Sequence, residues 1–165
     1  MRGERLTLRR ASESDVPQLI AILASPEVVQ WWGEPDVEGL RREVTGESGV
    51  VTFVVEVDSE TAGLIQYHEE NEANYRHAGI DIALAAQWQD RGFGAEAVRT
   101  LARYLFDQRG HHRLTIDPAA INLRGITCYR KVGFKPVGVM RRYERGADGT
   151  WHDGLLMELL REELT

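Results

Sequence analysis

One stretch of the sequence, residues 79–97, restricts the possible fold more than any other. In its first part, Asp81 alternates with the large apolar residues Ile80, Ile82 and Leu84, which is the periodicity of a β-strand. Successive side chains of a strand point to opposite faces, so Asp81 must face away from these three apolar neighbours. A carboxylate is therefore expected on a sheet face, close to where the strand ends.

A glycine turn and a helix follow this strand. Gly92 and Gly94 permit a tight turn and a close approach of the backbone to a ligand. From Ala95 the apolar period becomes that of an amphipathic helix, with apolar side chains at Val98, Leu101, Ala102 and Leu105. The N-terminus of a helix presents unpaired N–H groups and a positive dipole end, so the turn is predicted to bind phosphate.

The glycine turn alone allows other interpretations. The spacing Gly92-x-Gly94-x-x-Ala97 also fits the dinucleotide-binding fingerprint, with Asp117 about 20 residues further on. That fold needs repeated strand–helix units, and only one helical stretch remains after Asp117 before a strand-rich tail. A third interpretation is a turn without any ligand.

Composition restricts the class of protein. The chain of 165 residues is expected to form one domain over residues 1–165, with 42% hydrophobic and 28% charged residues. A net charge of −6 disfavours nucleic acid as a partner, since that binding requires a basic surface. No apolar run is long enough to cross a membrane, and no secretion signal is evident at Met1. A single cysteine and the absence of metal-ligand spacings favour a cytoplasmic protein without a metal.

The acidic residues are unevenly distributed. Residues 60–90 contain six carboxylates, including Glu69 and Glu70, against a single arginine. A cleft lined with them would concentrate a cationic substrate, although a solvated hairpin loop explains Glu69 and Glu70 equally well. The adjacent His111 and His112 are expected to be solvated.

The pattern of the whole chain predicts a mixed α/β domain around one sheet. Strands are expected over residues 5–10, 50–57, 62–68, 79–84, 113–117, 134–144 and 150–160. Helices are expected after Ser14 or Asp15 and over residues 36–45, 95–108 and 122–132, and Pro26 should end the first of them. Trp31 and Trp32 cannot both face one core from regular structure, so one of them is expected to wall a ligand cleft.

Two motifs together resemble the GNAT acyltransferases. Gln89-x-x-Gly92-x-Gly94 matches the loop that holds the pyrophosphate of acetyl-CoA in that family. Residues 116–134 match its second signature, with Asn122 followed by a glycine–isoleucine pair, Tyr129 and a terminal Gly-Phe. The resemblance covers most of the chain. It implies a mostly antiparallel mixed sheet of about seven strands, splayed at the acetyl-CoA site and flanked by about four helices.

Within this family, three features resemble the aminoglycoside 6'-N-acetyltransferases: Trp31-Trp32-Gly33, Gly79-Ile80-Asp81, and the segment from Asp117 to Tyr129. The resemblance implies direct acetyl transfer to an amino group of a polycationic sugar, which links the protein to antibiotic resistance. The substrate-binding residues are then expected to be Trp31, Trp32, Tyr67, Glu69, Glu70, Asp81 and Asp117. The residues expected to bind acetyl-CoA are Ile82, Ala83, Leu84, Gln89, Arg91, Gly92, Phe93, Gly94, Ala95, Asn122 and Tyr129.

The expected catalytic residues are Asp81 and Tyr129. Asp81 would take a proton from the amine, directly or through a water, and hold the cation; its alternative role is a strand aspartate bonded to nearby backbone. Tyr129 would protonate the leaving thiolate, and the alternative to this catalytic role is that of a core tyrosine. Asn122 either binds the pantetheine arm or caps its helix, and both roles are compatible. Cys128 is better explained as a small buried residue than as a nucleophile.

Two other functions remain open at this point. The tail from Arg141 to Gly154 resembles GNAT proteins that acetylate ribosomal-protein N-termini, which makes a protein N-terminus or another small amine the alternative substrate. The second alternative is a non-catalytic acyl-CoA-binding module. The sequence leaves a monomer and a homodimer equally open.

Overall fold

The structure is a computed structural model that describes residues 1–146 and 148–165. The described residues form seven strands, five α-helices and three short 3₁₀ turns. The strands are β1 (Thr7–Arg10), β2 (Val51–Val57), β3 (Glu60–Glu70), β4 (His77–Leu84), β5 (Arg113–Ile116), β6 (Lys135–Arg145) and β7 (Trp151–Leu160). The helices are α1 (Val16–Leu23), α2 (Pro26–Trp32), α3 (Val37–Thr45), α4 (Phe93–Asp107) and α5 (Leu123–Arg130).

All seven strands belong to one sheet in the order β1-β2-β3-β4-β5-β7-β6. Neighbouring strands are antiparallel except β4 and β5, which are parallel and pair at only two positions, Ala78 with Leu114 and Gly79 with Thr115. Beyond Gly79 the two strands diverge. The expected splayed, mostly antiparallel sheet is therefore confirmed, and residues 80–84 of β4 have no strand on their β5 side.

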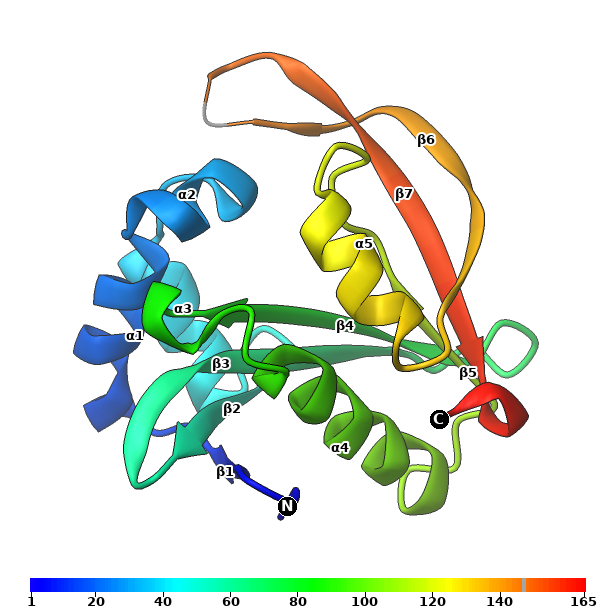
Figure 1. Cartoon of the computed structure of the whole chain (residues 1–165), viewed down its shortest axis with the longest axis horizontal. Helices are drawn as coiled ribbons and strands as arrows, with labels where there is room; N and C mark the ends of the chain where they lie inside the picture. Colours follow the sequence, from blue (N-terminus) through cyan, green and yellow to red (C-terminus); the bar gives the residue numbers. More distant parts are fainter. Residues whose placement is uncertain (147) are drawn as a thin grey trace.

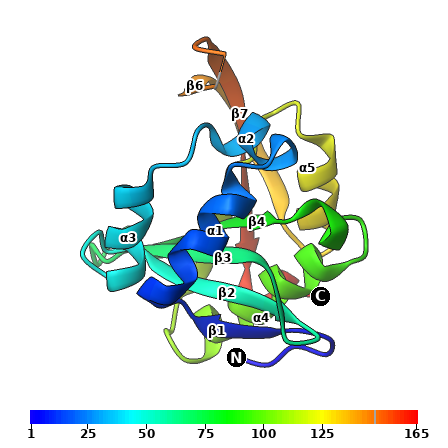
Figure 2. The same ribbon diagram turned by 90° about the vertical axis from the view of Figure 1, so that its left-hand side faces the viewer.

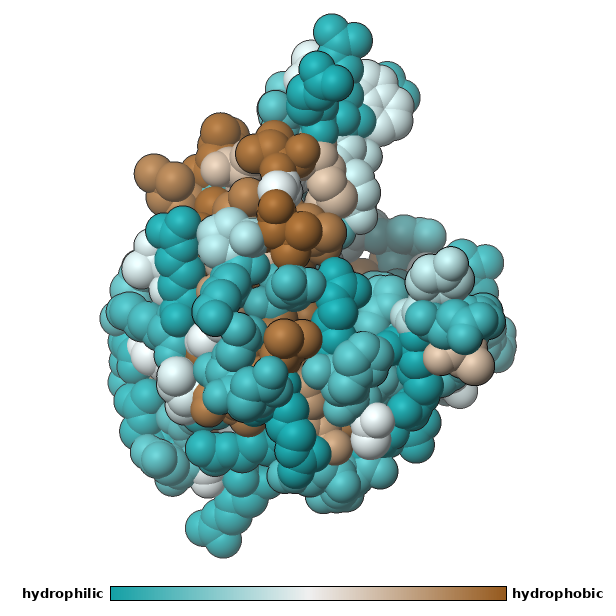
Figure 3. All heavy atoms as spheres, turned by 90° about the vertical axis from the view of Figure 1, so that its right-hand side faces the viewer, coloured by the Kyte–Doolittle hydropathy of each residue, from teal (hydrophilic) through white to brown (hydrophobic). Residues whose placement is uncertain are grey.

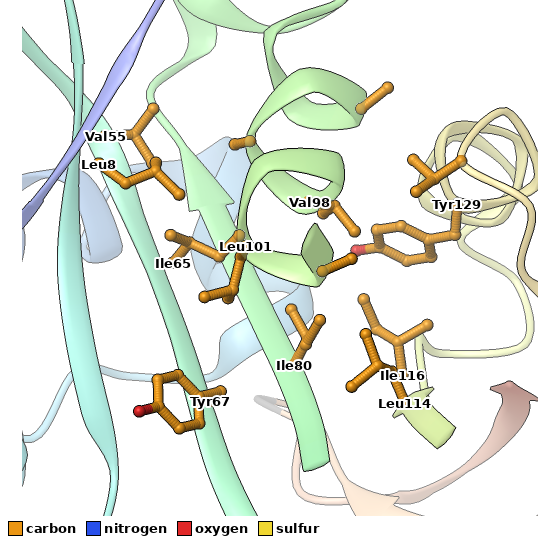
Figure 4. Packing of buried hydrophobic residues seen from close by; sticks show 14 of the residues in the cluster. Leu8, Val55, Ile65, Tyr67, Ile80, Val98, Leu101, Leu114, Ile116 and Tyr129 are labelled. Carbon is orange, nitrogen blue, oxygen red and sulfur yellow. The ribbon is translucent and has the colours of Figure 1, made fainter. Parts of the chain in front are cut away.

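Two hydrophobic clusters hold the helices on opposite faces of the sheet. The larger cluster packs α4 and α5 onto one face, with Leu101 and Leu105 completely buried at its centre. Figure 4 shows the side chains of α4 between those of the strands and those of α5. The smaller cluster packs α1 and α3 onto the other face through Leu19, Leu64 and Ala83. Figures 1 and 2 show these two helices on the side of the sheet away from α4.

The sequence analysis missed one helix. Pro26 follows the end of α1 as expected, but it also starts α2, because a proline at the first helical position already has the required φ angle. The structure therefore has five helices rather than about four. Consecutive residues of a helix point about 100° apart. This explains how α2 can carry both Trp31, which is half-buried, and Trp32, which is 37% exposed.

The β6–β7 hairpin projects from the body of the molecule (Figure 1). The strand β6 forms one edge of the sheet, and Val137 and Val139 on it are 52% and 58% exposed. Figure 3 shows apolar surface gathered at the base of the projecting part. The side chains of Tyr143 and Glu144, further along β6, reach the cavity described below.

Close approach of β3 to β4 requires glycine at position 63. A Cβ atom added to Gly63 would lie 2.1 Å from the carbonyl oxygen of Ala83. We expect Gly63→Ala to lower the free energy of unfolding by about 2 kcal/mol, because the backbone of β4 would have to move. Gly138→Ala is the matched control, since no atom lies within 4 Å of its added Cβ. Equal urea midpoints for the two variants would contradict this prediction.

Candidate active site

A cavity of about 900 Å³ opens where β4 and β5 diverge. Its walls come from α2, β3, the ends of β4 and β5, the segment after β5, the loop before α4, the first turn of α4, most of α5, and β6. A volume of this size is typical of small-molecule sites. Of the residues expected in the site, the following line the cavity: Trp31, Trp32, Asp81, Ile82, Ala83, Leu84, Gln89, Gly92, Gly94, Ala95, Asp117, Asn122 and Tyr129.

The loop between β4 and α4 forms an anion-binding N-terminus at one side of the cavity. Gly92 adopts a left-handed conformation with φ = +85° and is the residue before the first turn of α4. Its carbonyl accepts the hydrogen bond from the N–H of Glu96, so the N–H groups of residues 93–95 precede the first intrahelical bond. Gly94 allows α5 to come close, since an added Cβ would lie 3.3 Å from Sγ of Cys128.

The side chains of the loop stabilise its shape. Nε2 of Gln89 donates a hydrogen bond of 2.6 Å to the carbonyl of Leu84, which ties the middle of the loop to the end of β4. Phe93 is buried against Trp88, with ring centroids 5.5 Å apart, and the guanidinium of Arg91 lies over the Trp88 ring. Neither Arg91 nor Phe93 lines the cavity, so any contribution of these two residues to anion binding would come from their backbone amides.

Asp81 lies on β4 just past the last pairing with β5. Its carboxyl group is largely buried, lines the cavity, and has no hydrogen-bond partner among the described residues. Burial raises its pKa to about 6, with further contributions from the negative charges of Asp117 and Glu43. The described residues offer the carboxyl group of Asp81 no backbone hydrogen bond, so the structure does not support the alternative role of a strand aspartate bonded to nearby backbone. The carboxyl group is thus unusually basic and free to bind a ligand.

Other polar groups converge on the same end of the cavity. Asp117 follows β5 and accepts a hydrogen bond of 2.5 Å from the hydroxyl of Tyr143. This bond raises the pKa of Tyr143 to about 12. Burial, followed by the charge of Asp117, raises the pKa of Glu144. His68 also lines the cavity; its ring covers Gly79, where an added Cβ would lie 2.2 Å from Cε1 of the histidine.

Sequence reasoning missed several lining residues, among them Glu27, His68, Tyr143 and Glu144. His68 could have been found, because it is two residues from Gln66, which pairs with Asp81 across β3 and β4. Tyr143 and Glu144 left no local signal. They reach the cavity because β7 pairs with β5 and carries β6 beside it.

Tyr129 enters the cavity from α5. The residue is 8% exposed and packs edge-to-face on Phe134, with centroids 6.3 Å apart. Figure 4 shows its hydroxyl pointing away from α5, toward the side of α4 and β4. Burial raises the pKa of Tyr129 well above its ordinary value, so the phenol stays protonated at neutral pH. The ring belongs to the hydrophobic core while the residue also lines the cavity.

Asn122 and Cys128 complete the α5 wall. Oδ1 of Asn122 accepts a hydrogen bond of 2.9 Å from the N–H of Gly125, so the asparagine caps α5. Burial raises the pKa of Cys128 to about 11, which keeps the thiol protonated and unreactive.

Three of the expected substrate residues lie away from the cavity. Tyr67 pairs with Ile80 and faces α4, the opposite face from Asp81, where it stacks on Phe53 with ring centroids 6.3 Å apart. The strand period of two places Glu69 on that same face. Glu70 is exposed at the end of β3.

The neighbours of Glu69 explain why it is not part of an acidic cleft. Its carboxylate accepts hydrogen bonds from Arg109 at 2.8 Å and lies 2.7 Å from Nε2 of His111. These partners lower the pKa of Glu69 to about 2, the arginine contributing most. His111 was expected to be solvated and is instead 2% exposed, because it binds this carboxylate.

Across residues 1–146 and 148–165, no three His, Cys, Asp or Glu side chains are grouped so as to hold a metal ion. In the same part of the chain, no helix combines the length and the apolar character needed to span a membrane.

The splayed sheet, the anion-binding helix start and the buried carboxyl group define an acyltransferase type of site. A family model described as an acetyltransferase (GNAT) domain matches residues 5–135, and the chain belongs to this family. An aminoglycoside N(6')-acetyltransferase type 1 of Klebsiella pneumoniae is 29% identical over 158 residues, covering 84% of this chain and 78% of that protein. A spermidine N(1)-acetyltransferase of Escherichia coli is 28% identical over 111 residues, covering 67% and 59%.

A solved structure extends this likeness to the fold. Aminoglycoside acetyltransferase AAC(6')-Ib in complex with coenzyme A and kanamycin superimposes with a TM-score of 0.78. The sequence identity is 26%, and the superposition covers 96% of each chain.

The raised pKa of Asp81 has a measurable effect on folding. Above pH 6 the native state carries a buried charge, whereas the unfolded state has ionised near pH 4 without any such penalty. Native stability is therefore lost as the pH rises from about 4 to 6 and stays lower above that range. We expect Asp81→Asn to raise the free energy of unfolding at pH 8 by up to about 3 kcal/mol. Urea unfolding at pH 4 and pH 8 measures the difference, and an Asp81→Asn variant less stable at pH 8 would contradict it.

Proposed function

We propose that the protein transfers the acetyl group of acetyl-CoA directly to a primary amine of a cationic aminoglycoside, at the 6'-amine. The observation that carries the proposal is the position of Asp81. This unpartnered carboxyl group, whose pKa is raised to about 6, lies in the same cavity as an anion-binding helix start. Membership of the GNAT family and the aminoglycoside-modifying relatives support the same activity. Antibiotic resistance would follow from it.

The cavity fits a coenzyme thioester. Residues 82–84 of β4 have no paired strand on the cavity side, so backbone groups on this edge, apart from the Leu84 carbonyl held by Gln89, are available to the amides of a pantetheine arm. The amides of residues 91–95 surround the place for a diphosphate, since anions bind at helix N-termini. Gln89 and Asn122 would maintain this site by holding the loop and the start of α5. Acetyl-CoA, when bound, supplies the electrophilic thioester carbonyl.

The two catalytic residues would handle the protons of the reaction. The amine must lose a proton to attack the carbonyl, and the carboxylate of Asp81 accepts it directly or through a water. An ammonium group has a pKa of about 10, so the raised pKa of Asp81 reduces the difference between the pKa values of proton donor and acceptor. The negative charge of Asp81 also holds the cation in place. As the C–S bond of the tetrahedral intermediate breaks, the phenol of Tyr129 donates its proton to the thiolate. The nitrogen loses its second proton to become an amide, and this proton restores the phenol. The amide and the free thiol are then released.

The chemistry of the far end of the cavity supports a cationic substrate. Asp81, Asp117 and Glu144 place carboxyl groups there, and Trp31 and Trp32 offer aromatic faces that attract cations. A polyamine would use the same groups, and the spermidine-modifying relative supports it as the second candidate. A neutral peptide N-terminus would gain little from these carboxylates. The protein is proposed to act in the cytoplasm, as a monomer or a homodimer.

A panel of amines tests the proposed substrate class. We expect thiol release from acetyl-CoA in the presence of kanamycin, and a KM for kanamycin that rises with salt because screening weakens the attraction of a polycation to carboxylates. Spermidine and an uncharged N-terminal peptide serve as comparison substrates. Preference for the peptide, without salt dependence, would replace the aminoglycoside with a protein N-terminus. Coenzyme binding without thiol release from acetyl-CoA in the presence of any tested amine would indicate a non-catalytic acyl-CoA-binding module.

Substitution of the two catalytic residues tests their roles. Asp81→Asn should lower kcat by about 10²–10⁴-fold, because the amine loses its proton acceptor, while the affinity for coenzyme A stays unchanged. The wild-type rate should fall below pH 6 as Asp81 becomes protonated. Tyr129→Phe should lower kcat by about 10²-fold through loss of the proton donor.

Cys128→Ser is a suitable control for these variants, since the thiol has no chemical role in this scheme. A near-normal turnover of Asp81→Asn would remove Asp81 from the mechanism, and a wild-type rate for Tyr129→Phe would do the same for the tyrosine.

A further inference from the structure

An arginine outside the cavity contacts the anion-binding loop from behind. Arg5 precedes β1 and is absent from the cavity lining. Its backbone N–H donates to Oε1 of Glu96 at 2.6 Å, and its Nε donates to Oε2 of the same carboxylate at 3.0 Å. Glu96 is buried in the first turn of α4. Two points 91 residues apart in the sequence are thus joined at the start of the helix.

The same guanidinium contacts three successive residues of the loop. Nη1 of Arg5 donates a hydrogen bond of 3.2 Å to the carbonyl of Arg91. A Cβ atom added to Gly92 would lie 3.1 Å from Nη2. The guanidinium also lies 4.5 Å from the centroid of the Phe93 ring, in a cation–π contact. These contacts cover the side of the loop that faces away from the cavity.

The contacts have two physical consequences for an anion bound on the other side of the loop. First, they restrict the left-handed residue Gly92 and the carbonyl before it, and the direction of the following amides depends on both. Second, they compensate the charge of Glu96. A buried carboxylate in the first turn of α4 would repel a bound diphosphate, and the ion pair with Arg5 reduces that repulsion.

We propose that Arg5 is a positioning residue for the phosphate-binding loop. Held on Glu96, it fixes the conformation of residues 91–93 so that their amides are oriented for the diphosphate before the coenzyme arrives. The proposal rests on the proposed function to the extent that a coenzyme A derivative is the ligand. It makes the segment before β1 part of the coenzyme site, although that segment does not line the cavity.

Calorimetric titration with coenzyme A, without any amine, tests this role. We expect Arg5→Gln to raise the Kd for coenzyme A about tenfold, because the loop must be ordered on binding and Glu96 is left uncompensated. Hydrogen exchange of the amides of residues 91–95 should become faster in the same variant without ligand. Arg5→Lys keeps the charge but loses the forked geometry, so its Kd should lie between those of wild type and Arg5→Gln.

Arg9→Gln is the matched control. Arg9 lies on β1, pairs with Asp15 and Glu56 at 2.9 Å, and has no contact with the loop. We expect this variant to lose thermal stability and keep the wild-type Kd. An unchanged Kd in Arg5→Gln, or an equal rise in Arg9→Gln, would overturn the positioning role. If Arg5→Gln does not fold, a wild-type Kd in Arg5→Lys would overturn it as well.

This experiment separates the positioning role from the proposed catalytic function. A wild-type protein that binds coenzyme A but acetylates no amine would overturn the proposed function, and the comparison of Arg5 with Arg9 would still decide the role of Arg5. A wild-type protein that binds no coenzyme A would overturn both.

Discussion

The short parallel contact between β4 and β5 is the constraint on which the remaining structure depends. The two strands share only two residue pairs and then separate, so one edge of β4 stays unpaired over residues 80–84. An unpaired edge in the middle of a sheet exposes backbone donors and acceptors that need partners. The fold surrounds this edge with α2, α4, α5 and β6, and the cavity of about 900 Å³ is the space that remains. Burial of Asp81 follows from the same geometry.

The site combines two opposite electrostatic environments within one cavity. The start of α4 presents amides and a positive dipole end, which suits an anion. Asp81, Asp117 and Glu144 make the other end negative. A donor that carries phosphate and an acceptor that carries an ammonium group, as proposed here, would therefore be drawn to different ends, with the splayed strand between them. The same separation explains why charges near the loop, such as Glu96, are paired with arginine.

Local chemistry made much of this architecture predictable. The alternation around Asp81, the glycines of the loop and the cap at Asn122 each depend on residues close in sequence, and all three appear where they were expected. The predictions that were wrong concerned long-range neighbours. Glu69 was expected either in an acidic cleft or in a solvated loop, and it instead binds Arg109 and His111, which lie 40 and 42 residues away in the sequence. Helix α2 was missed because Pro26 ends one helix and starts the next within three residues.

By itself, the sequence determined where the strands and most helices lie along the chain, the strand face of Asp81 and the anion-binding helix start. The reason is that periodicity, glycine conformations and caps act over a few residues. Only the tertiary structure decided which acidic groups meet in one cavity. Pairing of β5 with β7 brings Tyr143 and Glu144 of β6 to Asp117, and the face of β3 that packs on α4 takes Tyr67 and Glu69 away. The ion pair between Arg5 and Glu96 is likewise a contact that only the tertiary structure decided. The physical reason is that burial and charge pairing depend on distances in space, and residues 91 positions apart carry no local signal that they will meet.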